Sequence, residues 1–221
     1  MGFDRDAWPR IAPFAIYMGF IVIADLLTRL GWTAQEQRWL YGVKIAAVLL
    51  ALWYWRRSYG ELRAGGLAAR AVGEAVAVGL LVLVLWVNLD ADWMVVGASA
   101  GFDPTVAGAI QWPLVAMRIA GAALVVPVME ELFWRSFLLR WLTSPKFLQV
   151  IPATVAIRGF LVTALLFGVA HNLWLAGVVA GVAYGWLYMR SGNLWSPILS
   201  HAITNGLLGV WITCTGHWAY W

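Results

Sequence analysis

The sequence predicts an all-α integral membrane protein, a polytopic bundle of about seven or eight transmembrane helices. Of its 221 residues, 62% are hydrophobic and only 12% are charged, and the mean hydropathy is +0.77. A soluble domain is nearer half apolar and a quarter charged, so this chain needs the bilayer as the solvent for much of its surface. The 16 Trp and seven Tyr residues fit this class, because their rings collect at membrane–water interfaces.

Each transmembrane helix needs about 20 apolar residues to cross the hydrocarbon core. Short hydrophilic stretches divide the chain into segments close to this length. We expect one transmembrane domain over residues 1–221, with scaffold helices in 1–117 and the candidate catalytic motifs in 118–210. The first apolar stretch lacks a clear small-residue cleavage site, so it is interpreted as a retained span rather than a signal peptide. Spans are expected at 11–30, 38–56, 69–90, 118–142, 157–173, 174–190 and 195–213, with an eighth helix or an interfacial one at 105–117.

Basic residues in the short loops predict the orientation of the chain. Residues 90–104 hold three Asp and no basic residue, and this stretch lies between two basic groups. With seven alternating spans, both groups fall in the cytoplasm, together with the N-terminus. The net charge of +4 then reflects these loops, and no nucleic-acid partner is expected. The two groups are Arg56, Arg57, Arg63 and Arg70, and Arg135, Arg140, Lys146 and Arg158.

Some polar and small residues fall inside the predicted spans. Asp25 and Lys44 lie at similar depth if the first two spans form a hairpin, so they either form an ion pair or extend to the nearer interface. Gly177, Gly181 and Gly185 repeat every fourth residue, which puts them on one helix face. Such a face lets a neighbouring helix approach closely, so we expect these glycines to serve packing.

An acidic pair, Glu130-Glu131, stands in an apolar segment. A carboxylate at the centre of a membrane helix costs roughly 2.5–3.5 kcal/mol. Glu131 and Arg135 are four residues apart and can pair on one face, whereas Glu130 is rotated by about 100° and faces another partner. Pro127, one turn earlier, removes a helical hydrogen bond and can admit water. The alternative is a helix end emerging among the headgroups.

Two further segments carry polar residues at helical spacing. His171 follows Phe167 by four residues, and Asn205 follows His201 by four, so each pair shares a helix face. A carboxylate base, imidazoles and an amide donor suit the attack of water on an amide carbonyl.

Other chemistries are less well supported by the sequence. Neither a GxSxG nor an HExxH motif is present. Cys214 is the single cysteine, which excludes an internal disulfide and a multi-cysteine metal site. Two alternatives from other classes stay open. The two histidines can ligate a b-type haem, or the carboxylates can relay protons in a protein without protease activity.

Taken in order, the motifs EExxxR, FxxxH and HxxxN resemble those of the CAAX-protease and bacteriocin-processing family of intramembrane endopeptidases, which includes the type II CAAX prenyl endopeptidases. The resemblance covers roughly residues 118–210. It implies an endopeptidase that hydrolyses a peptide bond near a membrane-associated segment, lipidated or transmembrane. The implied partners are a membrane protein or peptide substrate and the lipid bilayer, and the implied location is the bacterial inner membrane.

The resemblance also implies roles for individual residues. Glu130 would activate water with the help of His171, while His201 and Asn205 would form the oxyanion site. No cofactor is expected on this reading. The alternative is a zinc ion held by Glu130, His171 and His201. The supporting residues would be Glu131, Arg135 and Phe167.

Overall fold

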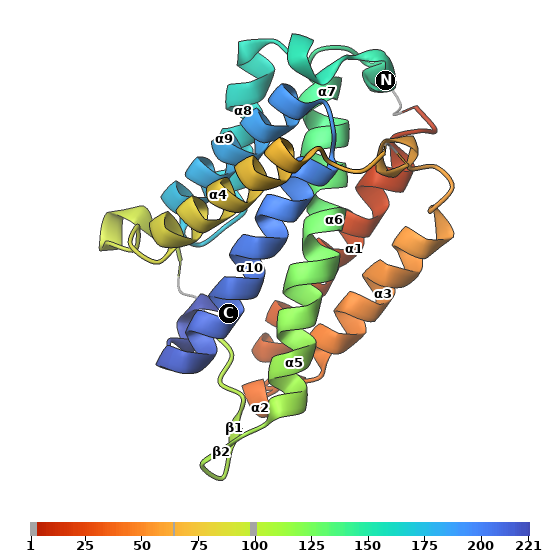
Figure 1. Cartoon of the computed structure of the whole chain (residues 1–221). Coiled ribbons are helices and arrows are strands. Elements are labelled where there is room, and N and C mark those ends of the chain that lie inside the picture. The colour runs from red at the N-terminus through yellow and green to blue at the C-terminus, as the bar shows by residue number, and fades with distance from the viewer. Residues whose placement is uncertain (1–3, 64, 98–100) are drawn as a thin grey trace.

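The computed structural model describes residues 4–63, 65–97 and 101–221 and is an all-α helical bundle, as the composition predicts (Figure 1). Its one sheet over these residues is a small antiparallel hairpin of β1 (Thr105–Val106) and β2 (Ala109–Ile110). The hairpin leads directly into the longest helical run of the chain.

This central helix extends without a break over Trp112–Trp141 and is 30 residues long. Two stretches of π-helix interrupt its α-helical pattern, and the acidic pair ends the α-helical stretch between them. Such π turns carry one extra residue and are frequent at functional sites. In order, the parts are α5 (Trp112–Ala120), π-helix Gly121–Val125, α6 (Val126–Glu131), π-helix Leu132–Leu138 and α7 (Leu139–Trp141).

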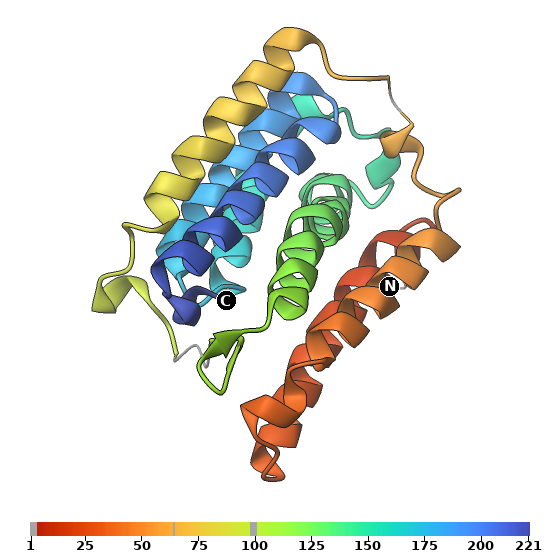
Figure 2. The same cartoon turned by 60° about the horizontal axis from the view of Figure 1, so that its bottom comes forward.

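The central helix lies between two groups of helices, as Figure 2 shows. On one side, α1 (Trp8–Arg29) and α3 (Leu40–Tyr54) form an antiparallel pair joined through the short α2 (Ala34–Gln37). On the other side lie α4 (Ala69–Trp86), α8 (Ile157–Val169), α9 (Trp174–Ser191) and α10 (Trp195–Thr215). Short 3-10 helices occupy the connections, at Gly60–Leu62, Asp92–Met94, Phe147–Gln149, Pro152–Thr154 and Trp218–Tyr220.

Four helices among the described residues are long and apolar enough to cross a membrane: α1, α4, the central helix and α10. Helices α3, α8 and α9 coincide with the other three predicted spans. The segment 105–117, expected as an eighth or interfacial helix, is instead the hairpin and the first six residues of the central helix. Large apolar side chains are exposed along the helices, which fits a lipid-facing surface; examples are Val22, Leu50, Leu81 and Leu165.

The glycines of α9 pack against α8, as their spacing predicts. A Cβ on Gly181 would come within 2.9 Å of the Ala164 backbone, and one on Gly177 within 2.9 Å of the Gly168 Cα. Close approach of two backbones therefore joins these helices. At its end, α9 stops at Gly192, whose φ of 65° is the left-handed conformation typical of a glycine after a helix.

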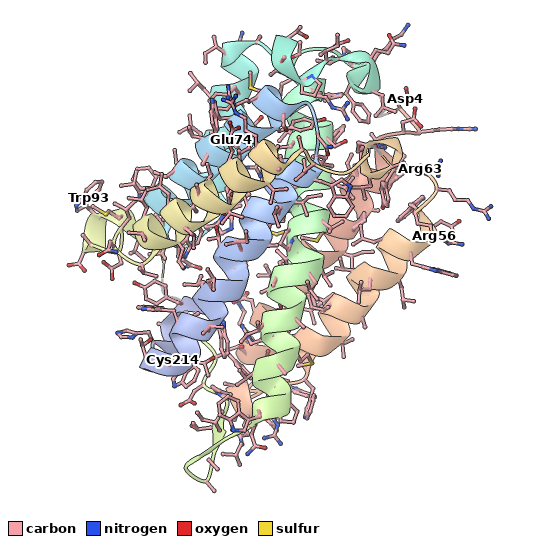
Figure 3. The ribbon with its side chains drawn as sticks, in the orientation of Figure 1. Asp4, Arg56, Arg63, Glu74, Trp93 and Cys214 are labelled. Carbon is pink, nitrogen blue, oxygen red and sulfur yellow. The ribbon has the colours of Figure 1, made fainter. Side chains whose placement is uncertain are left out.

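The structure corrects two expectations about charged residues. Arg135 and Arg140 lie in the central helix, which ends at Trp141 in agreement with the predicted span 118–142, but their side chains are buried in the bundle and do not belong to the basic loop after it. Asp25 pairs with Arg29, at 2.8 Å on its own helix, instead of with Lys44. The remaining loop bases are exposed, and Figure 3 shows Arg56 and Arg63 pointing away from the bundle at the end where Asp4 lies.

Candidate active site

A cavity of about 360 Å³ opens between the central helix, α10 and the end of α8. The four residues predicted to be catalytic all line it, although they come from three separate segments: Glu130, His171, His201 and Asn205. Phe167 lines it as well. The three sequence motifs therefore meet at one place inside the bundle.

Glu131 is the centre of a buried polar network. Its Oε1 accepts hydrogen bonds from Arg135 Nη1 and from His201 Nδ1, each at 3.0 Å. Glu131 and Arg135 are 0% and 1% exposed at their side chains. The ion pair expected from the spacing is present, and it also orients an imidazole that stands 70 residues further along the chain.

The guanidinium of Arg135 is held on several sides. It lies 4.4 Å from the ring centroid of Phe167 and 5.5 Å from that of Tyr184. Its Nη2 donates to the carbonyl oxygen of Gly181 at 3.3 Å. A planar guanidinium suits this combination of stacking and hydrogen bonding, so Arg135 ties the central helix to α8 and α9.

His171 lies just beyond the last residue of α8, Val169. Its Nδ1 is 2.7 Å from the carbonyl oxygen of Phe167, so Nδ1 carries the proton and donates, and Nε2 keeps its lone pair. The sequence alone did not explain how His171 could lie at the same depth in the membrane as His201. The shortness of α8, at 13 residues, brings its end to the cavity.

His201 is held through its ring face as well as through Nδ1. The imidazole stacks on Tyr184, with ring centroids 4.9 Å apart and planes inclined by 20°. Tyr184 is in turn fixed by its hydroxyl, which donates to Thr204 Oγ1 at 2.8 Å. With Nδ1 on Glu131, Nε2 is the nitrogen of His201 left for chemistry in the cavity.

Asn205 is anchored to a break in the central helix. Its Nδ2 donates to the carbonyl oxygen of Ala122 at 3.0 Å. Ala122 lies in the first π-helical stretch, five residues before Pro127, which has no N–H to offer that carbonyl. Pro127 thus leaves an acceptor for Asn205, whose second amide hydrogen stays available to the cavity.

Glu130 is 7% exposed and has no partner for its Oε2 among the described residues. Its neighbour Glu131 faces the Arg135 network, so the two adjacent carboxylates have different surroundings. A buried carboxylate that lines a cavity without a fixed partner is a candidate to bind water.

The alternative zinc ligands Glu130, His171 and His201 all line the cavity. Across the described part of the chain, no group of three or more His, Cys, Asp or Glu side chains is arranged to hold a metal ion. Glu130, His171 and His201 share the cavity but do not form such a set.

Fold and site together define the class: a helical membrane protein with a carboxylate, two anchored imidazoles and an amide around an internal cavity. Comparison with known families gives a more specific likeness. Residues 111–207 match the family described as type II CAAX prenyl endopeptidase Rce1-like, which confirms the resemblance inferred from the three motifs. At the level of the family, this implies a membrane protease. No curated protein and no solved structure gives a significant match.

Several cavity residues were not predicted as part of the site, among them Tyr184, Thr204, Lys44 and Arg118. Tyr184 directly precedes Gly185 of the packing row, and that position carried no sign that its ring would reach His201. Lys44 was recognised only as a charge within a span. Arg118 stands 12 residues before Glu130, outside every motif.

Proposed function

We propose that the protein is an intramembrane endopeptidase that hydrolyses a peptide bond near a membrane-associated segment by glutamate-activated water. The observation that carries the proposal is the meeting of four groups in one cavity: Glu130, His171, His201 and Asn205. They come from three segments that are distant in the sequence, and each has the chemistry that one step of the hydrolysis needs.

In the first step, Glu130 accepts a proton from water while the water oxygen bonds to the peptide carbonyl carbon. His171 assists through Nε2, because its Nδ1 is bound to Phe167. The carbonyl π electrons move to the oxygen. Nε2–H of a protonated His201 and the second amide hydrogen of Asn205 donate to this oxyanion.

In the second step, the tetrahedral intermediate collapses and the carbon–nitrogen bond breaks. The proton held by Glu130 moves to the leaving amine, which restores the carboxylate. Glu131 supports both steps indirectly, because its carboxylate orients His201 and offsets the positive imidazole, much as a buried aspartate does in a serine protease.

The test compares Glu130→Gln with the unchanged protein, reconstituted in vesicles with a lipidated or transmembrane peptide. Loss of a general base lowers the rate of cleavage by roughly 10²–10⁴-fold. Glu36→Gln, on the exposed α2, is the matched control and should keep full activity. Retained cleavage by a correctly folded Glu130→Gln protein would rule out the role of Glu130 as base.

Two further measurements separate the alternatives. Metal analysis and chelator treatment of the purified protein test the zinc-dependent alternative. A metal-free mechanism predicts that cleavage is unchanged after chelation. An absorbance spectrum of the purified protein addresses the haem reading, which requires an intense visible band from iron ligated by His171 and His201.

A further inference from the structure

His171 differs from the other three proposed reacting groups, because it stands in the turn of residues 170–173 between α8 and α9 rather than in a helix. Its backbone N–H donates to the carbonyl oxygen of Gly168, three residues back, at 3.0 Å. An α-helix would have used the carbonyl of Phe167, four residues back. That carbonyl is therefore left to the imidazole, whose Nδ1 donates to it at 2.7 Å. The direction of the ring thus depends on the path of the backbone through this turn.

A segment from another part of the chain holds the turn in place. Residues 93–96, which we call the strap, follow α4, and Trp93 is labelled beyond the end of that helix in Figure 3. Asn172 is bonded twice to Val96: its carbonyl oxygen accepts from the Val96 N–H at 2.8 Å, and its side-chain amide donates to the Val96 carbonyl at 3.0 Å. The indole of Trp174 donates to the carbonyl of Trp93 at 3.1 Å. These three hydrogen bonds clamp both ends of the turn to the strap.

Two aromatic rings pack against the imidazole of His171. The ring of Phe167 lies at 4.7 Å between centroids, with the planes inclined by 36°. Trp86, the last residue of α4, meets the imidazole edge-on at 5.4 Å, with the planes at 87°. Such an edge-to-face contact is a preferred arrangement of aromatic rings. The end of α4 therefore contacts the imidazole directly, and the strap that follows it holds the backbone.

Asn172 also has an ordinary explanation as a turn residue. Asparagine is common in turns, where its side chain bonds to backbone groups close by in the sequence. The amide of Asn172 instead donates to a carbonyl that lies 76 residues away. Asn172 is exposed and lines the cavity beside His171, so burial in the core does not account for its contacts. The clamp to the strap is what distinguishes this asparagine from a local turn former.

We propose that Asn172, through its clamp to the strap, is a positioning residue that aims His171 Nε2 at the water activated by Glu130. The inference rests on the proposed protease function, and it adds a residue that lies in none of the three motifs. Asn172 acts through His171 and not on the reacting atoms. A displaced catalytic group loses rate even when the shift is small, with about 1 Å costing up to about 100-fold.

The ring signals of His171 test the clamp independently of cleavage. The chain has only three histidines, so the spectrum of isotope-labelled histidine in the micellar protein is simple, and His171→Gln identifies the signals of His171. In the unchanged protein, the Nδ1 proton bonded to Phe167 should exchange slowly with solvent. Asn172→Asp keeps the shape but removes the donor to Val96, so this proton should exchange faster. The signals of His201 should not change, which shows that the fold is intact.

Two further variants make the comparison specific. Asn88→Asp is the matched control, because the exposed Asn88 amide also donates to a carbonyl, that of Val84, but within its own segment at 2.7 Å. It should leave the His171 signals unchanged. Trp174→Phe keeps an aromatic ring and removes the other side-chain bond to the strap, so it should speed the exchange of the His171 proton in the same direction as Asn172→Asp.

Cleavage of a membrane-bound peptide gives the second readout. Asn172→Asp should lower kcat roughly tenfold with KM little changed, because the misplaced imidazole serves the reaction and not the binding of substrate. Asn88→Asp should keep both constants. In a His171→Gln background, Asn172→Asp should cause no further loss, because a positioning residue has no effect once the group it positions is gone.

Each outcome decides one point. Unchanged exchange of the His171 proton in both Asn172→Asp and Trp174→Phe would overturn the positioning role. The same fold-loss of cleavage with and without His171, or a loss confined to KM, would overturn it as well. A faster-exchanging His171 proton in these variants, in a protein that cleaves no peptide at all, would support the clamp and contradict the protease function.

Discussion

Replacing Arg135 by methionine should destabilise the protein by about 3–5 kcal/mol, because it leaves the fully buried Glu131 carboxylate without its cation. The magnitude follows from the burial. Glu131 Oε2 already has no partner among the described residues, and Oε1 would keep only His201. Methionine fills most of the arginine volume, so a cavity contributes little to the loss.

A double replacement separates the charge effect from packing. In Glu131→Gln/Arg135→Met the buried charge is gone, and the glutamine oxygen can still accept from His201 Nδ1. We expect the pair to recover about 2–3 kcal/mol relative to the sum of the two single changes. Cleavage should nevertheless stay roughly 10–100-fold low, because His201 has lost a carboxylate partner.

The assay is reversible denaturation in detergent micelles, followed by far-ultraviolet circular dichroism, with cleavage measured on the same preparations. Arg29→Met is the matched control, since Arg29 and Asp25 have the same spacing but are mostly exposed. It should cost less than about 1 kcal/mol. A loss below 1 kcal/mol in Arg135→Met, or simple additivity in the double variant, would refute the reasoning.

Two other perturbations test the scaffold. Gly181→Ala puts a Cβ 2.9 Å from the backbone of Ala164, so it should lower the free energy of unfolding by about 1–3 kcal/mol and also lower cleavage. Gly73→Ala is the control, because a Cβ there meets open space and should change neither quantity. Denaturation curves of the two variants measure the difference in stability. The pKa of Glu61 is subject to burial, which raises it, but the hydrogen bond and charge of Arg10 hold it below its ordinary value of 4.5. Its stabilising contribution is therefore full above 4.5 and is lost as the pH falls through the lower folded-state pKa, so Glu61→Gln should flatten the acid limb of a stability–pH curve.

The local parts of the site were predictable from the sequence. Glu131 and Arg135 are four residues apart, and helical geometry alone brings such residues together. The packing role of the α9 glycines was predictable for the same reason, because their spacing alone puts them on one helix face. An ion pair between Asp25 and Lys44 was one of two equal alternatives from the sequence, and it does not form, because Asp25 pairs with Arg29 one turn away on its own helix. A neighbour on the same helix needs no tertiary arrangement to form its ion pair.

Contacts between distant segments were not predictable. The bond from His201 to Glu131 depends on how α10 crosses the central helix, and the stacking on Tyr184 depends on how α9 packs beside it. The burial of Arg140 had a different cause. The predicted span 118–142 already contains Arg140, which was counted among the cytoplasmic bases at its end, and nothing in the sequence indicated that its guanidinium would be buried against Ser136 and near Glu61.

The π-helical turns explain why the sequence did not predict that Arg118 lines the same cavity as Glu130. At about 100° per residue, 12 residues of ideal α-helix would turn Arg118 about 120° away from Glu130. The π-helical stretch Gly121–Val125 lies between them and absorbs one extra residue, which reduces the offset to about 20°. The same stretch supplies the Ala122 carbonyl that holds Asn205. One local departure from α-helical geometry therefore anchors the predicted oxyanion donor and turns Arg118 toward the same cavity, and periodicity read from the sequence contains neither effect.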